Sequence, residues 1–121
     1  MNLEELFRDS PHLRPYKPED VIFAEGDPGD RMYVIIEGDV QIRVGDGKIA
    51  TYGVGQIFGE MALIDDETRS ARAVALTDVV VAEIDPEAFK ALVAQNPEFS
   101  LQVMRVLVER LRQSDPRLWR E

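Results

Sequence analysis

The chain has 121 residues, of which 45% are hydrophobic, and a formal net charge of -9 at pH 7. This length and apolar content suit a buried core, and we predict that residues 1–121 form a single domain. The excess of acidic side chains argues against nucleic acid as a partner, which needs a basic surface, and against docking on an anionic membrane. Cysteine is absent, which excludes disulfides and thiolate-based zinc sites.

The first residues predict a short helix. Asn2 suits the position that caps a helix, and Glu5 follows at the spacing of a capping box. Pro11 and Pro15 limit the helix to the residues before them. The segment lacks the basic and apolar regions of a secretory signal, and no apolar run in the chain is long enough to cross a bilayer. We therefore expect a cytoplasmic protein.

The middle of the chain predicts about eight short strands separated by turns that contain glycine or proline. Gly38 divides one long apolar run into two strands, and the two glycines of "VGDGK" favour a hairpin turn. Many short strands of this kind indicate a barrel or a sandwich. The segments, with their turns, are "VIFAEGDPGD", "RMYVIIEGDVQIRV", "VGDGK", "IATYGVG", "SARAVAL" and "DVVVAEID".

Two helices follow the strands. Asp85 can cap a helix that Pro86 begins, and this helix ends at Asn96, before a proline. A second helix runs over residues 98–113. Helices gathered at the two ends of a strand-rich chain indicate an α+β fold.

The last helix carries two apolar stripes. One has the 3-4-3 spacing of a heptad seam and consists of Leu101, Met104, Val108 and Leu111. The other consists of Phe99, Val103, Val106 and Leu107. Because two stripes need two surfaces to pack on, we predict a homodimer through the 98–113 helix. The alternative is that both stripes pack within one chain.

The segment over residues 58–71, "FGEMALIDDETRSA", combines groups that suit a phosphorylated ligand. Gly59 lets the backbone approach a ligand, and the helix-like start after it offers unpaired amides to an anion. Arg69 can bind a phosphate through two parallel hydrogen bonds, beside the hydroxyl of Ser70. Glu60 would repel a phosphate but would accept hydrogen bonds from sugar hydroxyls. Together these groups describe a site for a nucleotide.

The same segment resembles the phosphate-binding cassette of cyclic nucleotide-binding domains, which occur in the bacterial catabolite activator protein, in regulatory subunits of cAMP-dependent protein kinase and in cyclic-nucleotide-gated channels. "YVIIEGDVQI" is similar to the family's paired strands, and the resemblance covers nearly the whole chain. It implies an eight-stranded β-roll, a jelly-roll-like barrel, with a short N-terminal helix and two C-terminal helices. It also implies a cyclic nucleotide as regulatory ligand.

The resemblance gives each cassette residue a role. Glu60 would bind the ribose 2′-hydroxyl, and the backbone amides of Met61 and Ala62 would face the phosphate. Arg69 would bind the exocyclic phosphate oxygens, and Ala71 would lead the chain into the next strand. The predicted ligand-binding residues are Phe58, Gly59, Glu60, Met61, Ala62, Arg69, Ser70 and Ala71.

Simpler structural roles compete with some of these functional ones. Arg69 can pair with the acids at residues 65–67, and Glu60 can be a carboxylate at the start of a helix. Arg72 adds a second cation to the site, or, if strand alternation turns it outward, is a surface charge. The family often has proline where this chain has Thr68, a difference that affects only the stiffness of the loop.

We predict a stand-alone receptor for cAMP, or less favourably cGMP, since Ser70 is compatible with both. The nucleotide would move the C-terminal helices, and an unidentified effector protein would respond. The alternative is a structural or dimerisation module of the same fold that binds no ligand or a different one. A DNA-binding regulator is disfavoured, because no helix-turn-helix follows the last helix. We predict neither catalysis nor a metal, since His12 is the only histidine and no nucleophile–base pair is evident.

Overall fold

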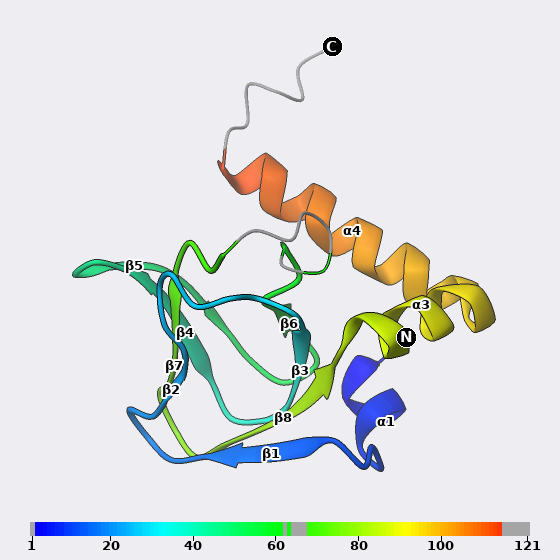
Figure 1. Cartoon of the computed structure of the whole chain (residues 1–121), viewed down its shortest axis with the longest axis horizontal. Coiled ribbons are helices and arrows are strands. Elements are labelled where there is room, and N and C mark those ends of the chain that lie inside the picture. Colours follow the sequence, from blue (N-terminus) through cyan, green and yellow to red (C-terminus); the bar gives the residue numbers. More distant parts are fainter. Residues whose placement is uncertain (1, 62, 64–67, 115–121) are drawn as a thin grey trace. The chain divides into compact units, whose positions relative to one another are not determined.

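The structure is a computed structural model, and it describes residues 2–61, 63 and 68–114 (Figure 1). Its contacts divide the chain into two compact units, one over residues 2–86 and one from Glu87 onward. The first unit holds α1 (Leu3–Phe7), β1 (Leu13–Tyr16), β2 (Val21–Phe23), β3 (Met32–Glu37), β4 (Val40–Val44), β5 (Gly47–Tyr52), β6 (Ile57–Phe58), β7 (Arg72–Ala75) and β8 (Val79–Ile84). Helices α3 (Pro86–Gln95) and α4 (Pro97–Ser114) follow. This order confirms the predicted α+β class.

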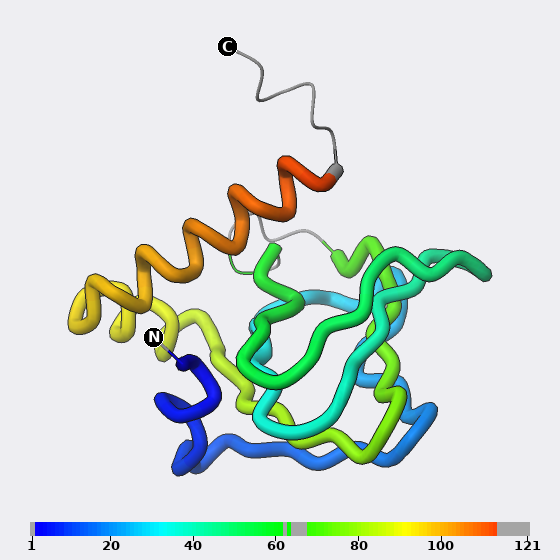
Figure 2. Tube along the Cα trace, turned by 180° about the vertical axis from the view of Figure 1, so that it is seen from behind, coloured from blue at the N-terminus to red at the C-terminus, as the bar shows by residue number. Residues whose placement is uncertain are grey.

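The strands form two antiparallel sheets of four strands each, with the orders β1-β8-β3-β6 and β2-β7-β4-β5. Strands β3 and β4 are consecutive but belong to different sheets, so the chain crosses between sheets at Gly38. This residue has a φ of +87°, and a Cβ atom there would lie 2.2 Å from the carbonyl oxygen of Asp78. Only glycine fits this crossing. The two strands therefore separate at Gly38, as the sequence predicted. The β4–β5 hairpin projects from the rest of its unit in both views (Figures 1 and 2).

Two strands were absent from the predicted segments. The first is β1, which contains Pro15 and lies at the edge of its sheet, where a missing N–H is tolerated. The second is β6, which has only two residues and pairs with Tyr33 and Val34. Helix α1 forms as predicted, but the side chain of Asn2 makes no capping hydrogen bond.

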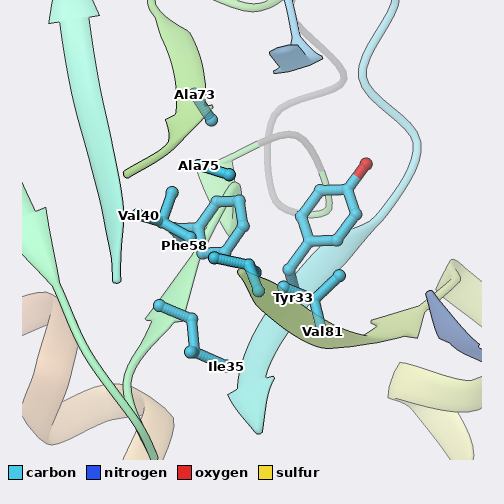
Figure 3. Close-up of a cluster of buried hydrophobic side chains, with 8 residues drawn as sticks. Tyr33, Ile35, Val40, Phe58, Ala73, Ala75 and Val81 are labelled. Carbon is cyan, nitrogen blue, oxygen red and sulfur yellow. The ribbon is translucent and has the colours of Figure 1, made fainter. Parts of the chain in front are cut away.

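The core of the first unit lies between the two sheets. Side chains of β3, β4, β6, β7 and β8 meet there, and Figure 3 shows the hydroxyl group of Tyr33 pointing away from Phe58. Alternate residues of a strand face opposite sides, so Ala73 and Ala75 in the core place Arg72 on the other face of β7. Arg72 lies on the face of β7 opposite this cluster, where it is half-buried and its Nε makes no hydrogen bond within the described part of the chain. The buried cluster consists of Tyr33, Ile35, Val40, Phe58, Ala73, Ala75, Val79 and Val81.

In the second unit, Asn96 caps α4 by accepting a hydrogen bond from the Phe99 amide at 3.1 Å, and Phe99 packs edge-on against Phe89 with ring centroids 6.0 Å apart. The two predicted stripes of α4 differ in exposure: Phe99 and Val103 are buried, while the heptad seam is exposed. The exposed fractions of the seam are 39% for Leu101, 54% for Met104, 38% for Val108 and 51% for Leu111. No helix in the described part of the chain is long and apolar enough to cross a membrane.

Candidate functional site

The main chain of Arg69 is fixed by the turn that follows β2. The amide of Arg69 donates to the carbonyl of Asp27, and the amide of Gly26 donates to the carbonyl of Arg69, both at 2.8 Å. Thr68 forms an isolated β-bridge with Pro28 next to these bonds. The "EGDPGD" turn therefore determines where the cassette arginine leaves the backbone.

The side chain of Arg69 is buried, with 8% of its surface exposed, and neutral groups hold it. Its Nη1 donates to the carbonyl of Gly59 at 2.8 Å and its Nη2 to the carbonyl of Arg31 at 2.7 Å. Its guanidinium carbon lies 4.1 Å from the ring centroid of Phe23 and 5.8 Å from that of Tyr33. Among the described residues, two neutral carbonyl groups and an aromatic ring therefore hold the guanidinium in one place.

Arg69 keeps donors for a ligand. A guanidinium has five N–H donors, and two hydrogen bonds from Arg69 are formed. Its Nε is buried and makes no hydrogen bond within the described part of the chain. A buried donor without an acceptor costs about 1–3 kcal/mol, so an anion that accepts from this edge would offset that cost. The competing pairing with the acids at residues 65–67 falls outside the described residues.

Gly59 lies against the same guanidinium. Its φ is +74°, and a Cβ atom there would be 3.0 Å from Nη1 of Arg69 and 3.2 Å from the ring of Tyr33. Any side chain would strain the backbone and press on the arginine. The sequence predicted a glycine for close approach to a ligand, and the structure adds that the glycine makes room for Arg69.

The sequence that forms this site matches a known protein family. Residues 13–96 match the family described as "Cyclic nucleotide-binding domain". The chain belongs to this family. It is 39% identical over 102 residues to the "CRP-like cAMP-activated global transcriptional regulator" of Mycobacterium tuberculosis. The aligned residues cover 80% of this chain and 46% of that protein.

Solved structures agree with this assignment. The catabolite activator protein of Thermus thermophilus superimposes with a TM-score of 0.78 and 34% identity, over 88% of this chain and 52% of that one. The cAMP-bound form of the EAL enzyme Bd1971 gives a TM-score of 0.63 and 38% identity, over 84% of this chain and 29% of that one. The cGMP-bound form of the same enzyme gives a TM-score of 0.65 and 37% identity, over 84% of this chain and 28% of that one. The chain thus spans about half the length of the regulators it matches.

The other cassette residues differ in their surroundings. Phe58 is buried in the core and stacks on Tyr33 with ring centroids 4.9 Å apart. It therefore packs beneath the site as part of the core and not as an exposed ligand-binding group. Glu60 is 7% exposed and lies next to Gly59, and its carbonyl accepts a hydrogen bond from the Leu63 amide at 3.1 Å. The side chain of Met61 is 59% exposed. The contacts of these residues with a nucleotide remain predictions.

The end of the cassette is more open. Ser70 is exposed and Ala71 is half-buried where the chain enters β7, while Ala62 lies outside the described residues. Arg72 is directed away from the core and contacts the carbonyl of Gly45 at 3.4 Å. The structure therefore brings Gly59 and Arg69 into contact and separates Arg72 from them.

Two residues that hold Arg69 were missed by the sequence analysis. Phe23 reads as an ordinary apolar strand residue, and nothing in its local pattern indicates a cation above its ring. Arg31 contacts Arg69 through its backbone carbonyl, a group that every residue has. Only the pairing of the family's turn with its cassette could have pointed to these positions.

Titratable groups around Arg69 are also perturbed. Hydrogen bonds to Asp30 and Glu83 raise the pKa of Arg31 above its ordinary range, and the hydrogen bond from Arg31 lowers the pKa of Asp30. Burial raises the pKa of Tyr33. Arg31 thus remains charged at any physiological pH. The described residues include no group of three or more side chains suited to a metal ion.

Proposed function

We propose that this chain is a receptor module for a cyclic nucleotide, and that Arg69 binds its phosphate. The observation that carries the proposal is a buried guanidinium held by two carbonyl groups and an aromatic ring. None of these partners neutralises its charge, and its Nε has no acceptor among the described residues. A cyclic phosphate supplies both a negative charge and acceptor oxygens.

The remaining roles follow the family pattern. We propose that Glu60 binds the ribose 2′-hydroxyl, that the amides of Met61 and Ala62 face the phosphate, and that Ser70 lies beside Arg69. The position of Glu60 supports this arrangement, because it directly follows Gly59, the residue that lies against the guanidinium of Arg69.

We propose cAMP as the preferred nucleotide. The regulator of Mycobacterium tuberculosis is named as cAMP-activated, which supports cAMP. The EAL enzyme was solved in both cAMP-bound and cGMP-bound forms, so cGMP is the necessary second ligand in any test.

We further propose a single, non-catalytic, cytoplasmic domain whose C-terminal helices move on binding and whose movement an effector protein detects. The exposed seam of α4 supports a homodimer through this helix. The same observation favours the second candidate function, a dimerisation module that binds no cyclic nucleotide or a different ligand.

Calorimetric titration of the purified chain with cAMP and with cGMP tests the proposal. We expect one molecule to bind per chain, and linear AMP to bind far more weakly because it lacks the cyclic phosphate. A ligand at 100 times its dissociation constant adds about 2.7 kcal/mol to the free energy of unfolding, so the melting temperature must rise as well. Absence of heat and of a melting shift with both cyclic nucleotides, at millimolar concentration, would favour the dimerisation module.

A further inference from the structure

We propose that the side chains of Glu83 and Arg31 are positioning groups for Arg69, the residue that binds the phosphate in the proposed function. They hold the backbone carbonyl of Arg31 at the place where it accepts the Nη2 hydrogen bond of Arg69. The inference rests on the proposed function and adds to it an ionic network outside the cassette.

The network starts on β8. Glu83 lies opposite Tyr33 in the β3–β8 pairing, two residues after Val81, and therefore on the core side of the sheet. Its side chain is only 13% exposed and it contacts two arginines. Oε1 lies 2.7 Å from Nε of Arg14, and Oε2 lies 2.5 Å from Nη1 of Arg31.

Arg31 joins this carboxylate to the ligand site. Its Nε and Nη2 also donate to the carboxylate of Asp30, at 2.8 and 3.3 Å. Its backbone carbonyl accepts from Nη2 of Arg69 at 2.7 Å. One residue thus contacts β8 through its side chain and the cassette arginine through its main chain.

The position of this carbonyl depends on the network for a physical reason. Arg31 ends the connection between β2 and β3 and precedes the first residue of β3. A charge-assisted pair with a largely buried carboxylate is stronger than an exposed one. Without it, the ion-pair partner left to Arg31 among the described residues would be Asp30, whose side chain is 68% exposed. The carbonyl could then shift, and hydrogen bonds weaken steeply as they lose alignment.

A purely electrostatic effect on the ligand gives a different pattern, which makes the inference testable. If only charge mattered, loss of the Arg31 cation would weaken binding of the anionic nucleotide, and loss of the Glu83 anion would strengthen it. If positioning matters, both losses weaken binding. Arg14 is the matched control, because it contacts the same carboxylate but its side chain is 61% exposed, whereas Arg31 also bonds Arg69 through its carbonyl.

The experiment is calorimetric titration of the full chain with cAMP, in the variants Arg31→Ala, Glu83→Gln and Arg14→Ala. Arg31→Ala keeps the carbonyl and removes only its anchor. We expect Arg31→Ala and Glu83→Gln each to weaken binding about three- to tenfold, the range of one hydrogen bond, and Arg14→Ala to change it less than twofold. Because both side chains act through one carbonyl, the double variant Arg31→Ala/Glu83→Gln should lose no more affinity for cAMP than the weaker-binding single variant.

A background variant separates positioning from general destabilisation. In Arg69→Lys, which cannot reproduce the planar fork, Glu83→Gln should no longer weaken binding, whereas a general loss of structure would weaken it as before. Unchanged or tighter binding by Glu83→Gln in the wild-type background overturns the inference. So does additive loss in the double variant. If the wild-type chain binds neither cAMP nor cGMP, the proposed function fails first, and this inference fails with it.

Discussion

The guanidinium of Arg69 lies over the ring of Phe23, with its central carbon 4.1 Å from the ring centroid. Phe23 in turn packs against Tyr33 and Phe58, at centroid distances of 5.9 and 6.1 Å. Tyr33 and Phe58 belong to the buried core. The cassette cation therefore rests on the core of its own unit, and changes in that core should affect the binding of an anion.

Replacing Phe23 with leucine should weaken cyclic nucleotide binding while preserving the fold. Leucine keeps an apolar side chain at a half-buried position but removes the cation–π contact, worth about 0.5–2 kcal/mol. The dissociation constant should therefore rise roughly 2- to 30-fold, as measured by calorimetry. Ile22→Leu, on the same strand, serves as the control and should bind like the wild type. Equal affinity of Phe23→Leu and wild type would mean that the ring does not hold Arg69.

Arg69→Ala should cause the largest loss of affinity among single changes. A buried ligand charge without its main partner typically costs about 2–5 kcal/mol, which corresponds to roughly 30-fold to several thousand-fold weaker binding. Arg69→Lys should recover only part of the affinity that Arg69→Ala loses, because an ammonium group cannot reproduce the planar fork. Arg72→Ala removes the same charge on the face of β7 opposite the core cluster and should cost much less affinity.

Thermal melts of each ligand-free variant are needed to show that the fold persists. Binding by Arg69→Ala within threefold of wild type would contradict the assignment of the cassette. A larger loss from Arg72→Ala than from Arg69→Ala would mean that the phosphate contacts the other arginine.

Gly59→Ala tests whether the room left for Arg69 matters. Gly59 and Gly45 both have positive φ, +74° and +56°, so alanine at either costs backbone strain of about 1–2 kcal/mol. Only at Gly59 would the new Cβ meet Arg69, at 3.0 Å, whereas nothing lies within 4 Å at Gly45. We expect similar losses of stability in denaturant titrations, but a loss of affinity of about tenfold or more for Gly59→Ala alone. Equal affinities would show that Arg69 adjusts without cost.

Strands, helices and the cassette arginine could be predicted because local chemistry marks them. Gly38 separates β3 from β4, Pro86 begins α3, and Arg69 follows a recognisable motif. β1 was missed because Pro15 argues against a strand unless the strand is known to lie at an edge, which is a tertiary fact. The same holds for the support of Arg69. Neither the ring of Phe23 nor a backbone carbonyl carries a local signal of its role.

Stability should fall at high pH because Tyr33 is buried. Burial raises the pKa of Tyr33 above its ordinary value of 10.0. Below that value the phenol is protonated in both states, so its burial contributes fully to the free energy of unfolding. As the pH rises above about 10, the unfolded chain loses the proton first, and stability declines. In urea titrations, Tyr33→Phe should decline less steeply than wild type between about pH 9 and pH 11. Parallel declines would mean that the hydroxyl is solvated.

The exposed seam of α4 predicts that the chain dimerises through this helix. Val108 lies near the middle of the stripe and is 38% exposed in the single chain. In a two-fold dimer, Val108→Glu would place like charges near each other across the seam. Sedimentation should give twice the chain mass for wild type and the chain mass for Val108→Glu. Gln113→Glu adds the same charge at an exposed position outside both stripes and should leave the dimer intact. A wild-type monomer at high micromolar concentration, with and without nucleotide, would mean that the seam serves another purpose.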